Sequence, residues 1–238
     1  MNYFVLDTYE DLSHRAGEIF MEQLKVKRGL LLGASTGSTP GGLYARLAES
    51  AREDPSLFGA LRVIKLDEWH GIPMNDPASC ESYLRTWLLQ PLNIGHDRYF
   101  SFRSDTKNHE AECRAMKAML DQNGPIDLCI LGLGMNGHIA FNEPATTLTA
   151  HPHLATLARS SQFHPMVADR AVKPEHGLTL GMADIFQSRM ILLLVSGTAK
   201  RDIVQNLLSQ RITTALPASL LWLHPNVVCL MDQDAYRT

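Results

Sequence analysis

The chain has 238 residues, 45% of them hydrophobic and 20% charged, with a formal net charge of −3. This is the composition of a soluble globular protein with room for one large α/β domain or two small ones. The slight negative charge and the lack of any basic run exclude a general attraction to nucleic acid, so we expect no nucleic-acid partner.

Secretion and membrane insertion are not expected either. The N-terminus has no basic region followed by a long apolar core, and the apolar run from Met190 to Val195 is far too short to cross a bilayer. The cysteines are scattered without a Cys-x-x-Cys pair, and Cys129 and Cys229 lie in strand-like apolar runs. We therefore expect a reduced, cytoplasmic protein with no membrane partner.

Apolar runs typical of buried strands alternate along the chain with segments of helical spacing. This alternation predicts right-handed crossovers and an α/β fold with a doubly wound, mainly parallel sheet and helices on both faces (Rossmann-like). Repeats, low-complexity segments and a Gly/Ser linker are absent, so residues 1–238 are interpreted as a single domain. The expected strands are 29–33, 62–66, 128–133, 190–195 and 227–231, and the expected helices are 9–24, 43–51, 83–89, 110–120 and 199–208.

A small-residue turn follows the first predicted strand. The segment Ala34-Ser-Thr-Gly-Ser-Thr-Pro40 precedes a helix expected from about Gly41, which would expose backbone N–H groups at a helix N-terminus, where an anion such as phosphate binds. It is neither a Walker A sequence nor a dinucleotide fingerprint. An ordinary Ser/Thr-rich helix cap is the alternative. Lys200, after another buried strand, is either a second anion contact or a solvated helix residue.

The strand predicted at 62–66 ends in an acidic pair, Asp67 and Glu68. Their side chains point to opposite sides if the strand continues, so at most one is expected to face a site directly. A carboxylate at this edge could take a proton from a carbon next to a carbonyl, although a helix cap or a surface salt bridge is also possible. Metal binding by this pair with His70 fits no standard spacing.

The most informative stretch is 127–144. It begins as a continuous apolar strand and then breaks into glycines that deliver Asn136, His138 and Glu143 in one short turn. Ligands of open parallel sheets bind beyond the carboxyl ends of the strands, where this turn lies. His138 is suited to move a proton near neutral pH, and Glu143 is close enough in sequence to orient it.

Together these motifs resemble the glucosamine-6-phosphate deaminase/isomerase family. The resemblance extends from about residue 5 to residue 230 and is carried by Ser35–Pro40, Leu66–Trp69 and Gly134–Pro144. The sequences Lys65-Leu-Asp-Glu-Trp69, Ser101-Phe-Arg-Ser104 and Ala218-Ser-Leu-Leu-Trp-Leu-His224 look closest to the galactosamine-6-phosphate branch. The 6-phosphogluconolactonases have the same fold, but their turn after Gly-His differs.

The resemblance implies conversion of a hexosamine 6-phosphate and water to a 2-ketose 6-phosphate and ammonia, with no metal and no organic cofactor. His138, oriented by Glu143, would open the sugar ring, and Asp67 would move the proton from C2 to C1. The expected partner is a small-molecule sugar phosphate, with a homo-oligomer possible. The implied catalytic residues are Asp67, Asn136, His138 and Glu143, and the implied phosphate ligands are Thr36, Gly37, Ser38, Thr39 and Lys200.

This sequence departs from the family at three places. Asn136 stands where some members carry aspartate. The segment 145–176, interpreted as an active-site lid because it is long and irregular, lacks the family's phosphate-binding arginine at 162–167, which leaves Arg159 and Arg170 as candidates. The stretch 146–153 has no arginine or lysine, so the amino-sugar allosteric site of some bacterial members is not expected.

Two alternative functions remain open. A non-catalytic sugar-phosphate sensor would keep the phosphate-binding turn but could lose Asp67 or His138, and it would carry a DNA-binding segment. This chain keeps both residues and begins directly with the domain, which favours an enzyme. Lactone hydrolysis on the same fold is the second alternative.

Overall fold

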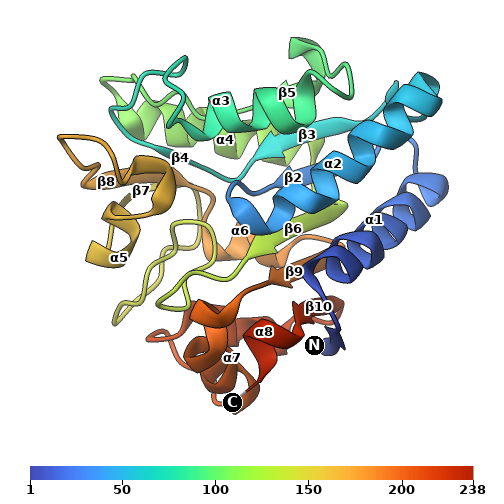
Figure 1. Cartoon of the computed structure of the whole chain (residues 1–238). Coiled ribbons are helices and arrows are strands. Elements are labelled where there is room, and N and C mark those ends of the chain that lie inside the picture. The colour runs from blue at the N-terminus through green and yellow to red at the C-terminus, as the bar shows by residue number, and fades with distance from the viewer. Residues whose placement is uncertain (238) are drawn as a thin grey trace.

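A seven-stranded parallel sheet forms the centre of the computed structural model, which describes residues 1–237 (Figure 1). Every strand pair in this sheet is parallel. The five strands predicted from apolar runs are all present, so the expected fold class is confirmed. In spatial order the strands are β1 (Asn2–Leu6), β10 (Val227–Asp232), β9 (Met190–Val195), β6 (Leu128–Gly132), β2 (Leu31–Ala34), β3 (Arg62–Lys65) and β5 (Tyr99–Phe100).

Helices cover both faces of the sheet, and alternate residues of each strand belong to two separate cores. Leu192 and Leu194 of β9 pack on one side, and Ile191 and Leu193 on the other. Side chains of α1 (Tyr9–Val26), α2 (Ser38–Glu53) and α3 (Cys80–Leu84) with the helical turn after it (Arg85–Leu89) fill the first core. The second is filled from α4 (His109–Asn123), α6 (Met182–Phe186), α7 (Arg201–Leu208) and α8 (Gln233–Tyr236).

A second, three-stranded antiparallel sheet lies beside the first. The chain leaves β3, passes Leu66 and continues as β4 (Asp67–Trp69), which pairs with β8 (His176–Thr179), and β8 in turn pairs with β7 (His153–Thr156). The segment 145–176 thus contains a strand, as well as α5 (Arg159–Gln162) and a 3₁₀ turn (Pro165–Val167). The expectation of an irregular segment was wrong for these residues, because several of its side chains pack in a third apolar cluster that contains Trp69, Phe141, Ala155, Leu157 and Val167.

The structure also differs from the sequence prediction at β1 and at the start of α2. The edge strand β1 was not predicted, because it is short and pairs only with β10, so Tyr3 and Phe4 remain exposed and no buried pattern marks it. Helix α2 begins at Ser38 rather than Gly41, since Gly37 caps it with a φ of 115°, a conformation that favours glycine. Pro40 then occupies the first turn, where its missing N–H is tolerated.

The four cysteines are free thiols and all are buried, which confirms the interpretation of Cys129 and Cys229. Within residues 1–237, none of the helices combines the length and the apolar character needed to cross a bilayer.

Candidate functional site

The candidate site lies where the strand order reverses. From β2 the chain proceeds outward through β3 and β5, and then returns to place β6 on the other side of β2. The loops after β2 and β6 therefore leave the same edge of the sheet side by side, which is where open α/β sheets bind ligands. Two adjoining cavities of about 160 and 70 Å³ open at this edge. Their shared lining is Thr36, Gly132, His138, Ser161 and His164.

The larger cavity is bounded by the turn after β2. Two tyrosine side chains hold the backbone of this turn. The Tyr44 hydroxyl donates to the Ser35 carbonyl at 2.7 Å, and the Tyr83 hydroxyl donates to the Gly37 carbonyl at 2.6 Å. The amides of Ser38 and its two neighbours, Gly37 and Thr39, have no acceptor within the described chain. Free N–H groups at the start of a 16-residue helix form an anion-binding surface.

Lys200 reaches the same cavity from the opposite loop. It precedes α7, and its ammonium donates to the Leu133 carbonyl at 2.6 Å, a contact that fixes its Nζ near the exit of β6. Burial lowers the pKa of Lys200, so a neighbouring anion would stabilise its charge. The structure thus brings Lys200 together with the predicted phosphate ligands Thr36, Gly37, Ser38 and Thr39 around one cavity.

A tight turn after β6 positions His138. The Gly134 amide donates to the His138 carbonyl at 3.0 Å, and Gly137 adopts a positive φ of 86°. A Cβ atom on Gly134 would lie 2.5 Å from the His138 ring, so the imidazole rests directly on this glycine. Glycines at these two positions are therefore what allow the ring to lie at the cavity wall.

Glu143 and Asn136 orient His138. The Nδ1 atom of His138 lies 3.3 Å from Oε2 of Glu143, and the Asn136 side-chain amide donates to the same oxygen at 2.7 Å. Oδ1 of Asn136 also accepts from the His138 backbone N–H at 3.2 Å. Burial alone would raise the pKa of Glu143, but hydrogen bonds from His138, Ser161 and Asn136 outweigh it and lower the pKa. An ionised Glu143 at Nδ1 leaves Nε2 of His138 free to accept a proton.

Asp67 lines the smaller cavity, together with Trp69 and His138. The side chain is buried, and its carboxylate has no hydrogen-bond donor within residues 1–237. Burial first, and then the negative charge of Glu68, raise the pKa of Asp67 to about 7, while the Lys65 ammonium opposes them. A carboxyl group with this pKa is half ionised at neutral pH, as a general base requires.

Glu68 points away from the cavities, which confirms that only one member of the acidic pair faces the site. It forms a fully buried ion pair with Lys65 at 2.6 Å, and Lys65 also contacts Glu81 at 3.0 Å. The backbone amides of Trp69 and Cys80 donate to Glu68 as well, each at 2.9 Å. This network fixes Glu68, the residue after Asp67, and Lys65, two residues before it.

The segment around α5 contributes two residues that the sequence did not single out. The Ser161 hydroxyl lies 3.3 Å from Nδ1 of His138, and His164 lines both cavities. The candidate Arg159 lies 5.8 Å from the Phe163 ring instead, and Arg170 pairs with Asp76. Neither guanidinium lines these cavities, so the suggestion that one replaces the lid arginine was wrong for this structure. The only sequence signal for His164 was its place in the stretch that lacks arginine.

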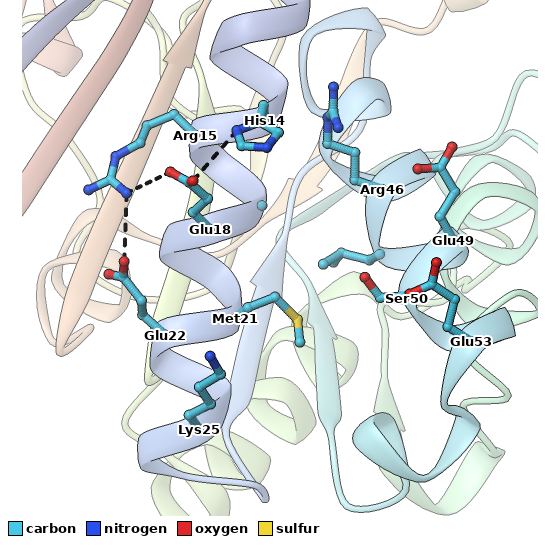
Figure 2. Close-up of a pocket in the computed structure, with 12 residues that line it drawn as sticks. His14, Arg15, Glu18, Met21, Glu22, Lys25, Arg46, Glu49, Ser50 and Glu53 are labelled. Atoms are coloured by element: carbon cyan, nitrogen blue, oxygen red, sulfur yellow. Dashed lines mark hydrogen bonds and ion pairs between the residues drawn. The ribbon is translucent and has the colours of Figure 1, made fainter.

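A wider groove of about 470 Å³ lies elsewhere, between α1 and α2 (Figure 2). Acidic and basic side chains mix along it, and Arg15 pairs with Glu18 at 2.9 Å and with Glu22 at 3.6 Å. It has no lining residue in common with the cavities at the sheet edge. The groove therefore takes no part in the candidate site.

Comparison with known proteins decides the family. Residues 7–229 match the family of glucosamine-6-phosphate isomerases and 6-phosphogluconolactonases. The chain belongs to this family. A glucosamine-6-phosphate deaminase of Geobacillus sp. (strain WCH70) is 39% identical over 232 residues, which cover 95% of this chain and 91% of that protein.

Solved structures of the family agree with the fold. A monomeric glucosamine-6-phosphate deaminase superposes with a TM-score of 0.92 at 34% identity, over 99% of this chain and 98% of that one. The 6-phosphogluconolactonase of Trypanosoma brucei superposes with a TM-score of 0.77 at 21% identity, over 98% of this chain and 97% of that one. The second likeness concerns the fold alone.

Proposed function

We propose that this protein is a hexosamine-6-phosphate deaminase/isomerase. It converts galactosamine 6-phosphate, or glucosamine 6-phosphate, and water to the corresponding 2-ketose 6-phosphate and ammonia. The observation that carries the proposal is that Asp67, His138 and an anion-binding helix N-terminus surround two adjoining cavities, with Glu143 paired to His138. The similarity to proteins named glucosamine-6-phosphate deaminase supports it.

Binding begins at the larger cavity. The 6-phosphate accepts hydrogen bonds from the backbone amides and hydroxyls of Thr36–Thr39, and the Lys200 ammonium supplies an opposite charge. These phosphate contacts fix one terminus of the sugar, so the reacting carbons extend toward the smaller cavity. The contacts are remote from the bonds that change and serve mainly for positioning.

Ring opening falls to His138. Its Nε2 atom takes the proton of the anomeric hydroxyl, and the bond between C1 and the ring oxygen breaks to leave a C1 aldehyde. The ring oxygen becomes the hydroxyl on C5 by taking that proton from the imidazolium. The ionised Glu143, 3.3 Å from Nδ1, stabilises the imidazolium that forms. Asn136 contributes indirectly, since it holds Glu143 and the His138 backbone in register.

Asp67 then transfers a proton between adjacent carbons. It removes the C2 proton while the C1 oxygen gains a proton, giving an enolamine. It then returns a proton to C1 as the amino group loses one, which leaves a ketimine at C2. Water adds to the ketimine carbon, ammonia leaves, and the 2-ketose 6-phosphate is formed. These steps are assigned to side chains of this chain and to water.

Ammonia release from purified protein tests the proposal, with galactosamine 6-phosphate and glucosamine 6-phosphate compared side by side. The expected result is equal amounts of ammonia and 2-ketose 6-phosphate, with galactosamine 6-phosphate as the better substrate. A protein that binds these sugars without turnover would be a sensor, and one that instead hydrolyses 6-phosphogluconolactone would be a lactonase. Either result would refute the proposal.

A further inference from the structure

His164 is the one ionisable lining residue of both cavities that the mechanism above does not use. It follows α5, is half-buried, and its ring centroid lies 5.9 Å from that of Trp69. Because it lines the phosphate cavity as well as the Asp67 cavity, it lies at their junction. A substrate that spans both cavities must pass it.

The hydrogen-bonding state of the ring follows from its neighbours. The Met166 backbone N–H donates to Nδ1 of His164 at 3.3 Å, which makes Nδ1 the acceptor and places the ring hydrogen on Nε2. Burial, with the nearby charges of His138 and Lys200, lowers the pKa of His164 to about 4. The imidazole is therefore neutral near pH 7. Its Nε2–H has no acceptor among residues 1–237 and remains available to a ligand.

The position along the substrate follows from the two ends of the site. With the phosphate on C6 at the helix N-terminus and C2 at Asp67, the junction faces the middle of the sugar chain. We propose that His164 donates its Nε2 hydrogen to the hydroxyl on C4 and is a specificity-determining residue. This inference rests on the proposed function. C4 is the centre at which galactosamine and glucosamine differ, so a donor fixed there distinguishes the two epimers.

Two variants and one control test this assignment. His164→Phe keeps a planar ring but removes the donor, and His164→Gln restores an N–H group near the position of Nε2. Phe163→Leu is the control, because Phe163 is adjacent, exposed and absent from both cavity linings. Each protein is assayed for kcat/KM with both sugar phosphates, for inhibition by inorganic phosphate, and for its melting temperature.

The Phe variant should change the ratio of kcat/KM between the epimers by about tenfold, the effect of one neutral hydrogen bond. The Gln variant should have an epimer ratio much closer to that of the wild type, and the control should have the wild-type ratio. Inhibition by inorganic phosphate should be unchanged in all of them, since phosphate occupies the other end. Equal losses with both epimers, or weaker phosphate inhibition, would overturn the assignment. If the Phe variant does not fold, the Gln variant decides: a ratio close to wild type supports the donor, and a ratio changed tenfold refutes it.

The two proposals fail in different ways. If the wild-type protein is active but substitutions of His164 leave the epimer ratio unchanged, only the role proposed for His164 is refuted. If the wild-type protein releases no ammonia from either sugar, the proposed deaminase function itself is refuted.

Discussion

The proposed site has a phosphate end and a reaction end, and the two consist of different kinds of chemical group. At the phosphate end, the binding groups are mainly backbone amides at the start of α2, held in place by tyrosine hydroxyls, with Lys200 as the nearby cation. At the reaction end, they are titratable side chains from separate elements, with Asp67 on β4 and His138 on the turn after β6. One end depends on a backbone conformation and the other on ionisation states.

This difference has consequences for how each end responds to change. A helix N-terminus keeps its positive potential at any pH, so phosphate binding should be nearly independent of the ionisation of Asp67. The reaction end uses a carboxyl group whose pKa is about 7 because it is buried and lies near Glu68. Changes in the charges that neighbour Asp67 should therefore alter turnover without altering phosphate affinity.

The largest expected effect is that of Asp67→Asn. The amide preserves shape but cannot accept the C2 proton, so kcat should fall by about 10²–10⁴, the usual contribution of a general base. KM and inhibition by inorganic phosphate should be nearly unchanged, because the phosphate end is intact. Steady-state ammonia release measures both parameters, with Asp105→Asn, an exposed carboxylate, as control. Activity within tenfold of wild type would exclude Asp67 as the base.

Lys200→Ala should affect mainly KM, whereas Asp67→Asn affects mainly kcat. Loss of a charge-assisted contact to phosphate costs about 1.5–3 kcal/mol, or roughly tenfold to a hundredfold in affinity. KM should rise more than kcat falls, and inorganic phosphate should inhibit the variant more weakly. The matched control is Arg201→Ala, since the Arg201 side chain contacts the Asp234 carbonyl and does not line the cavity. An unchanged KM with unchanged phosphate inhibition would mean that Lys200 is only structural.

The pH profile separates the two ends in a single protein. The proposed mechanism requires the base form of Asp67, so kcat should fall by about tenfold for each unit below the pKa of about 7. Glu68→Gln removes a charge that raises the pKa of Asp67, and should move this acidic limb to lower pH. Profiles of kcat for both proteins provide the measurement. An acidic limb at the same pH in both proteins would contradict the electrostatic coupling between Glu68 and Asp67.

The remaining expected effect is on stability. The pKa of Asp67 is raised in the folded state from 3.8 to about 7, so ionisation progressively destabilises the fold as pH rises through that range. Asp67→Asn removes this cost and should increase the free energy of unfolding at pH 8 by a few kcal/mol at most. The gain should vanish as pH falls toward 4. Urea unfolding at both pH values checks this, and a gain that is independent of pH would refute it.

The sequence predicted the site residues that local motifs supply better than those that distant segments bring to the site. Continuous apolar strands such as 190–195, and the glycines of the turn around His138, are local signals, because burial on both faces and tight turns restrict which residues fit. The role of Lys65 as partner of Glu68 and the approach of His164 to both cavities depend on packing between segments distant in sequence. No local pattern encodes such contacts. The strand at 153–156 was missed for the same reason, since it pairs with β8 outside the main sheet.

The central claim is that Asp67 moves hydrogen from C2 to C1 in a sugar held by its phosphate. Galactosamine 6-phosphate with deuterium at C2 tests it most directly, with ammonia measured alongside the label at C1 of the 2-ketose product. The wild-type protein should release ammonia and carry part of the deuterium to C1, and Asp67→Asn should do neither at a comparable rate. Contradiction would come from a wild-type protein that releases no ammonia, or from a variant that releases ammonia and transfers the label as the wild type does.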